Sequence, residues 1–162
     1  VFDYKNGLGC GTPVLNRKWV GANPDALAKI AGLNIDEKVE MLIAETDAND
    51  PFVQEEQMMP LLPIVRANDF SQGLAIAKQS EHGDKHSAMI HTMNVARMTE
   101  MGQAMDTTIF VKNGPCVASL GMGGEGFISF SIATTTGEGI TTPRTFTRYR
   151  RCTLVNNLNI VT

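Results

Sequence analysis

Strand-like and helix-like segments alternate along residues 61–113, and this alternation limits the chain to few folds. The order is "LLPIVRA" (61–67), a strand; "NDFSQGLAIAKQSEHG" (68–83), a helix; "SAMIH" (87–91), a buried strand; "NVARMTEMGQAM" (94–105), a helix; and "TTIFVKN" (107–113), a strand. It predicts two successive βαβ units, which need a parallel sheet with right-handed crossovers. We therefore expect an α/β fold.

Local signals support the two helices of this region. Asp69 stands three residues before Gln72, which is capping-box spacing, and Gly83 is a plausible stop. The second helix places Val95, Met98, Met101 or Gly102, and Met105 on one face. Pro63 pushes the first strand toward a sheet edge or toward its own start.

The preceding part of the chain is less regular. Residues 1–21 are rich in glycine and turn formers and are expected to be irregular. "NPDALAKIAG" (23–32) predicts a helix with Asn23 as its N-cap, "VEMLIAE" (39–45) predicts a strand, and "TDANDPFVQEEQMMP" (46–60) predicts a polar loop.

The C-terminal part has a different pattern. "FISFSIA" (127–133) and "RTFTRYRRCTLVNNLNIV" (144–161) alternate like strands, but the second segment has no cleanly apolar face. Such a strand suggests an arm that completes a sheet elsewhere, such as on another subunit. We expect residues 127–162 to form a β-rich tail that includes the arm.

Composition excludes several classes of protein. A chain of 162 residues with 43% hydrophobic and 19% charged residues can bury one sizeable core. A net charge of −3 argues against a nucleic-acid partner, and no apolar run reaches the roughly 18 residues of a membrane span. Three scattered cysteines indicate a reducing, intracellular setting. Because the chain opens without Met or a signal sequence, we expect it to be a piece of a longer, non-secreted protein.

The glycines of "GMGGEG" (121–126) have the spacing of a dinucleotide-binding turn. A phosphate-binding turn also needs a strand directly before it and a helix directly after it. Here the preceding strand ends near Asn113, a β-like segment follows, and Glu125 would repel a pyrophosphate. The motif is therefore expected to be a tight surface loop.

Other reactive side chains give weak signals. His82 and His86 have the i,i+4 spacing of a metal pair, but Gly83 lies between them in an expected loop, so no metal site is predicted. Cys116 follows a strand in a Gly/Pro loop without a histidine close by in sequence. Cys152 is expected to pack within a strand, and Cys10 has no assigned role.

Glu55 and Glu56 precede two methionines in "FVQEEQMMP" (52–60). Carboxylates beside soft apolar side chains can bind a sugar hydroxyl and pack against a ring. On the residues alone, a solvated acidic loop over a core methionine is the simpler interpretation.

Long stretches of the sequence resemble one enzyme family. "PFVQEEQMMPLLPIVRANDFSQGLAIA", "HSAMIHTMNVARM" and "TTIFVKNGPCVASLGMGGEGFISFSIATTTGEGITTPRTFTRYRRCTLVNNLNIV" are similar to the C-terminal part of the CoA-acylating aldehyde dehydrogenases of propanediol and ethanolamine utilisation. The likeness runs from about residue 15 to the end. It implies that residues 1–126 are the C-terminal part of the family's catalytic α/β domain, and that residues 127–162 are a β-rich tail with the oligomerisation arm. "EEQMMP" resembles the form that this subgroup has of the wider family's "EEIFGP" motif.

The resemblance implies a reaction and a set of partners. The complete enzyme would oxidise propionaldehyde or acetaldehyde with NAD and coenzyme A through a cysteine thioester, giving acyl-CoA and NADH. It would be a cytoplasmic homo-oligomer joined through the C-terminal arm, without nucleic acid or membrane partners. A bacterial microcompartment is a further expected location, reached through an N-terminal segment outside this sequence.

The resemblance also assigns residues. Glu56 matches the carboxylate that holds the nicotinamide ribose hydroxyls, and Met58 the side chain that packs near the nicotinamide. Leu120 and Met122 correspond loosely to the aldehyde pocket. No residue matches the family's catalytic cysteine, so the 162 residues alone are expected to be inactive.

Two alternatives stay open at this stage. One is a free-standing α/β binding or assembly module that is not an enzyme. The other is the aldehyde dehydrogenase half of a bifunctional alcohol–aldehyde dehydrogenase.

Overall fold

The computed structural model describes residues 1–4, 11–129, 139–153 and 155, and the chain divides into two compact units, Val1–Gly83 and Asp84–Thr162. The first unit contains β1 (Phe2–Tyr4), β2 (Pro13–Leu15), η1 (Arg17–Trp19), α1 (Pro24–Ile30), β3 (Leu42–Glu45), α2 (Pro51–Gln54), β4 (Leu61–Ile64) and α3 (Phe70–Ser80). The second contains β5 (Ser87–Ile90), α4 (Val95–Met105), β6 (Ile109–Lys112), η2 (Cys116–Leu120) and η3 (Pro143–Phe146). Among the described residues, no helix has the length and apolar character that a bilayer crossing requires.

The first unit opens with a short hairpin-like pair that the sequence did not predict. β1 and β2 pair antiparallel, with Phe2 opposite Leu15 and Tyr4 opposite Pro13. The prediction of an irregular segment is wrong here, because strands of three residues are too short to leave a recognisable alternation.

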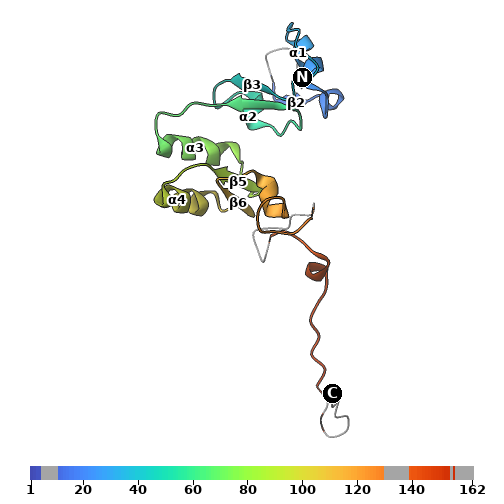
Figure 1. Cartoon of the computed structure of the whole chain (residues 1–162), viewed down its shortest axis with the longest axis vertical. Helices are drawn as coiled ribbons and strands as arrows, with labels where there is room; N and C mark the ends of the chain where they lie inside the picture. The colour runs from blue at the N-terminus through green and yellow to red at the C-terminus, as the bar shows by residue number, and fades with distance from the viewer. Residues whose placement is uncertain (5–10, 130–138, 154, 156–162) are drawn as a thin grey trace. The chain divides into compact units, whose positions relative to one another are not determined.

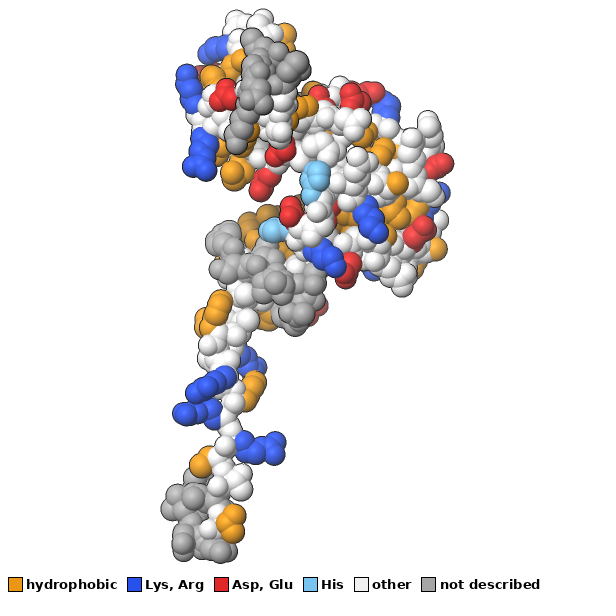
Figure 2. All heavy atoms as spheres, turned by 180° about the vertical axis from the view of Figure 1, so that it is seen from behind, with side chains coloured by type: hydrophobic (Ala, Val, Ile, Leu, Met, Phe, Trp, Pro, Cys, Tyr) orange, Lys and Arg blue, Asp and Glu red, His pale blue; other side chains and the backbone are white. Residues whose placement is uncertain are grey.

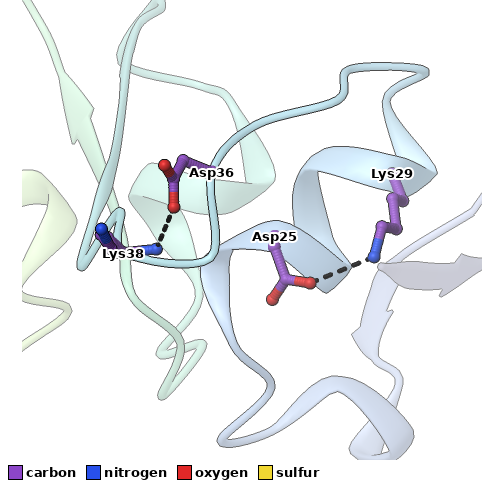
Figure 3. A network of polar contacts seen from close by, with 4 residues as sticks. All are labelled: Asp25, Lys29, Asp36 and Lys38. Atoms are coloured by element: carbon purple, nitrogen blue, oxygen red, sulfur yellow. Dashed lines mark hydrogen bonds and ion pairs between the residues drawn. The ribbon is translucent and has the colours of Figure 1, made fainter.

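Helix α1 confirms the prediction for residues 23–32. It buries Leu27 and Ala28, while Asn23 occupies the N-cap position without a side-chain cap hydrogen bond. On its exposed face the ammonium of Lys29 lies 3.1 Å from the carboxylate of Asp25, an i,i+4 ion pair visible in Figure 3. The hydrogen bond from Lys29 lowers the pKa of Asp25 below its ordinary value.

The next turn of chain is closed by a side chain. The backbone N–H of Lys38 donates to the Asp36 carboxylate at 2.9 Å, as Figure 3 also shows. This Asx-type hydrogen bond stabilises a turn in the segment that connects α1 to β3.

Strands β3 and β4 form a parallel pair, in register from Leu42 opposite Leu61 to Glu45 opposite Ile64. Both strands are edges within the described residues, which agrees with the edge position that Pro63 predicts. The connecting segment is not wholly a loop, because Asp50 accepts a hydrogen bond from the N–H of Phe52 at 2.8 Å and starts the single turn α2. Four residues are too few for a helical period, so the sequence did not reveal this turn.

The second unit is built on the parallel pair β5 and β6, in register from Ser87 opposite Ile109 to Ile90 opposite Lys112. Helix α4 connects the two strands and lies beside them (Figure 1). A Cβ on Gly102 of α4 would stand 3.2 Å from the Phe110 ring, so this glycine allows the helix to approach the sheet closely. The predicted βαβ unit over residues 87–113 is confirmed. For the other predicted unit, the observed parallel partner of β4 is the earlier strand β3.

The core of the second unit includes a residue from the predicted tail. Ile109, Val111 and Ile140 are buried together, with Ala118 and Leu120 packed against them. The sequence pattern did not anticipate Ile140 in this core, since it follows the turn-rich "TTTGEG" stretch.

The predicted strand over residues 144–161 is wrong at its start. Residues Pro143–Phe146 form the 3₁₀ turn η3, because Pro143 stands at a helical first position and the N–H of Thr142 donates to the Thr145 hydroxyl at 3.0 Å. Residues 147–153 follow without an assigned strand, and residues 154 and 156–161 lie outside the described part. Of the predicted strand 127–133, residues 127–129 carry no strand and the rest is not described.

Exposed positive charge gathers on this last segment. Its arginines are Arg144, Arg148, Arg150 and Arg151. Figure 2 shows Lys and Arg side chains along the segment that leads to the C-terminal end. The guanidinium of Arg144 donates to the Tyr149 hydroxyl at 2.8 Å.

We expect Asp69→Ala to lower the free energy of unfolding by about 1 kcal/mol, because Asp69 accepts the N–H of Gln72 at 2.8 Å and caps α3. Asp69→Asn retains a hydrogen-bond acceptor and should lower the free energy of unfolding by only a few tenths of a kcal/mol. Urea unfolding followed by circular dichroism measures both variants. Equal losses for alanine and asparagine would contradict a capping role.

Candidate functional site

Glu56 and Met58 lie in the connection between α2 and β4. The Glu56 side chain is exposed, and Met58 is 60% exposed with a left-handed backbone φ of 49°. A residue with a side chain seldom adopts this conformation, and such backbone geometry often occurs at functional sites. The loop therefore presents a carboxylate and a thioether to the outside of the first unit.

Two hydrogen bonds hold this loop in place. The side-chain amide of Gln57 donates to the Phe52 carbonyl at 2.8 Å, and the N–H of Gly21 donates to the Met58 carbonyl at 3.1 Å. The first bond ties the loop to α2, and the second ties it to the segment before α1. Sequence reasoning missed both Gln57 and Gly21, since neither carries a reactive group and Gly21 is distant along the chain.

The side-chain amide oxygen of Gln57, Oε1, is buried and has no hydrogen-bond partner within the described residues. A buried acceptor without a donor is costly. The observation marks this loop as a place where a further group is expected to dock.

The second unit carries a hollow of about 460 Å³ beside the end of β6. Its lining comes from β6, η2 and the glycine turn: Phe110, Val111, Lys112, Asn113, Gly114, Pro115, Ala118, Ser119, Met122, Gly123, Gly124 and Glu125. Met122 is one of these residues and is 65% exposed, whereas Leu120 packs against the core. The structure thus brings only one of the two predicted pocket residues to the hollow.

Asn113 lines this hollow and connects the ends of the two strands. Its backbone is left-handed, with φ of 56°, and its side-chain oxygen accepts the N–H of Thr92 at 2.8 Å. Thr92 follows β5, so the bond joins the carboxyl ends of the two parallel strands. Ligands commonly bind at this edge of parallel sheets.

The turn over residues 121–126 has a structural role. Gly121 and Gly123 have φ of 84° and 86°, which glycine adopts without strain. The turn follows η2 instead of a strand, and residues 127–129 after it are not helical, so it lacks the context of a nucleotide-phosphate turn.

The described cysteines and histidines belong to no group that could hold a metal ion. Cys116 begins η2, and burial raises the pKa of its thiol above the ordinary value. The Nε2–H of His82 donates to the Gln54 carbonyl at 3.0 Å, and the Nδ1 of His86 shares a hydrogen bond with the Ser87 hydroxyl at 2.6 Å. Within the described residues, no group of three or more His, Cys, Asp or Glu side chains could hold a metal. Cys10 lies outside the described residues, and Cys152 is exposed.

We expect Gly126→Ala to destabilise the chain by about 2 kcal/mol, because the Ser119 carbonyl occupies the space that the new Cβ needs. Gly114→Ala is the matched control, since its Cβ would meet Val111 at an ordinary 3.5 Å. Chemical denaturation midpoints compare the two. A Gly126→Ala variant as stable as Gly114→Ala would show that the turn is not packed as described.

The raised pKa of Cys116 predicts slow alkylation. At pH 8 the folded chain should hold less thiolate at Cys116 than the unfolded chain, because unfolding removes the burial that disfavours the charged form. Iodoacetamide labelling read by peptide mass spectrometry should therefore be slower in the native chain than in denaturant, with the difference shrinking as the pH rises. Equal or faster labelling of the native chain would contradict this.

Comparison with known proteins bears on the whole chain. Residues 40–129 match the model of the aldehyde dehydrogenase family, which is more than half of the 162 residues. The acetylating acetaldehyde dehydrogenase of Salmonella typhimurium is 47% identical over 151 residues, covering 93% of this chain and 32% of that protein.

Solved structures agree. A propionaldehyde dehydrogenase from the Clostridium phytofermentans fucose utilisation bacterial microcompartment is 46% identical with a TM-score of 0.80, over 85% of this chain and 32% of that one. The Rhodopseudomonas palustris propionaldehyde dehydrogenase, solved with bound CoA and an acylated cysteine, is 41% identical with a TM-score of 0.78, over 86% of this chain and 33% of that one.

The chain spans about a third of the length of these relatives. They confirm the predicted α/β fold and the resemblance to the CoA-acylating subgroup. On the family match and these likenesses, the chain belongs to the aldehyde dehydrogenase family.

Proposed function

We propose that this chain is the C-terminal third of a CoA-acylating, NAD-dependent aldehyde dehydrogenase that converts a short aldehyde to its acyl-CoA. The observation that carries the proposal is the clamped loop that exposes Glu56 and Met58, in a chain 47% identical to an acetylating acetaldehyde dehydrogenase. Propionaldehyde and acetaldehyde are the substrates to test, since both are named among the relatives.

The exposed groups of this loop fit the cofactor. A carboxylate accepts hydrogen bonds from two neighbouring ribose hydroxyls, which is the part proposed for Glu56. A thioether packs well against an aromatic ring, which is the part proposed for Met58. NAD, when bound, supplies the hydride acceptor. The bonds to Phe52 and Gly21 hold the backbone of this loop before it binds.

The second unit contributes part of the aldehyde pocket in this proposal. Met122 lines the hollow directly, and Leu120 supports it from the core side. The nucleophile would come from outside this chain, because no residue here matches the family's catalytic cysteine, and burial raises the pKa of the Cys116 thiol. We therefore expect the 162 residues alone to show no turnover.

Exposed apolar surface supports a place in a longer protein. A hollow of about 500 Å³ in the first unit has an almost wholly apolar lining, which includes Leu27, Ile43 and Phe52. Ile43 is 64% exposed although it lies in a parallel strand, a kind of strand that is normally buried on both faces. A free-standing module would be expected to cover such a surface.

Further assembly is part of the proposal. The use of the tail beyond residue 126 as an oligomerisation arm is supported by its exposed, arginine-rich end. Residence in a microcompartment is supported by the source of one solved relative. A relative named acetylating acetaldehyde dehydrogenase is 47% identical, whereas a relative named aldehyde-alcohol dehydrogenase is 27% identical, which favours a monofunctional enzyme over a bifunctional one.

In the full-length protein, Glu56→Gln should raise the KM for NAD about tenfold, because charge-assisted hydrogen bonds to the ribose are weakened. Glu55→Gln is the matched control, since it removes the neighbouring exposed carboxylate of the same loop. The assay follows NADH formation from propionaldehyde, CoA and NAD.

Three results would count against this assignment. One is equal KM values for both variants, and another is no change at Glu56. The third is turnover by the isolated 162 residues that disappears with Cys116→Ala, which would reassign the nucleophile.

A further inference from the structure

The hollow beside β6 has polar groups that a simple alkyl aldehyde would not use. Lys112, Ser119 and Glu125 are among its lining residues, and none of their side chains makes a hydrogen bond or ion pair within the described part of the chain. More of the lining surface is polar than apolar. Polar groups in a binding site fix the orientation of a ligand.

Size does not restrict this hollow to the smallest aldehydes. Its volume of about 460 Å³ lies within the range of pockets that hold drug-sized ligands, roughly 300–1,000 Å³. A two- or three-carbon aldehyde fills only a small part of it. The residues of this chain that line the hollow therefore contribute to selection among short aldehydes through their chemistry and not through size.

The charges of the lining favour a neutral ligand. The Lys112 ammonium would attract an anionic substituent, but the Glu125 carboxylate would repel it. A cationic substituent would be attracted by Glu125 and repelled by Lys112. A hydroxyl group suits both, because it donates one hydrogen bond and accepts up to two. Val111 and Met122 offer apolar contacts to the carbon chain.

We propose that this hollow selects short aldehydes that carry a hydroxyl group, which donates to Glu125 and accepts from Lys112. Lys112 and Glu125 are then specificity-determining residues for the reaction. The inference rests on the proposed function, in which the hollow receives the aldehyde.

Glycolaldehyde and propionaldehyde test this, because they differ only by a hydroxyl in place of a methyl group. In the full-length enzyme, Glu125→Gln and Lys112→Met should each lower kcat/KM for glycolaldehyde about tenfold, as expected for losing a hydrogen bond to a charged group. The kcat/KM for propionaldehyde should change less than about twofold, since its methyl group uses neither charge. Because each substrate is compared with itself, hydration of the aldehydes cancels.

Matched controls are Glu100→Gln on α4 and Lys78→Met on α3, exposed residues that do not line the hollow. They should leave both kcat/KM values unchanged. If a variant does not fold, Ser119→Ala takes its place in the same comparison.

The outcomes separate the two levels of the argument. Turnover of propionaldehyde but not of glycolaldehyde by the unmodified enzyme would overturn the inference and leave the proposed function standing. A parallel loss on both substrates, or no loss on either, would also overturn it. No turnover of either aldehyde would instead contradict the proposed function.

Discussion

The parallel pairing of β5 with β6 is the constraint on which the second unit depends. Four residue pairs, from Ser87 with Ile109 to Ile90 with Lys112, align the carboxyl ends of both strands. Only with this register can Asn113 reach the N–H of Thr92, and only then do η2 and the glycine turn border the same hollow. A shift by one residue would also exchange the buried Ile109 and Val111 for Phe110 and Lys112.

In the first unit, hydrogen bonds fix the loop that carries Glu56 and Met58. The loop that follows α2 exposes the Glu56 carboxylate and the Met58 thioether, and two hydrogen bonds fix its backbone. Met58 pays a conformational cost for its left-handed backbone, and the bonds from Gln57 and Gly21 offset that cost. Glu56 needs no special environment of its own, because its proposed part requires only an exposed charge in a fixed position.

The sequence predicted what depends on periodicity. The apolar face of Met98, Met101 and Met105 and the β-branched run around Ile109 are long enough to identify α4 and β6. Elements set by single capping bonds escaped prediction, as Asp50 at α2 and Thr142 at η3 show. Contacts between distant residues, such as Gly21 with Met58 or Ile140 with Ile109, leave no local signal.

The candidate site residues also differ in how well the sequence predicted them. The family resemblance supplied Glu56 and Met58, whose motif is specific, and the structure then showed how they are held. It supplied Leu120 and Met122 only loosely, and their side chains lie on different sides of η2 and the turn, one toward the core and one at the hollow. The composition and spacing of the glycines alone would have pointed to a phosphate turn, which the missing helix contradicts.

The central claim is that the loop of Glu56 and Met58 contacts the nicotinamide half of NAD. A crystal structure of the full-length enzyme with NAD tests it most directly. The account predicts Glu56 carboxylate oxygens about 3 Å from the ribose hydroxyls next to the nicotinamide, with the Met58 sulfur against the ring. A cofactor whose ribose is held by other groups, with Glu56 left in solvent, would contradict it.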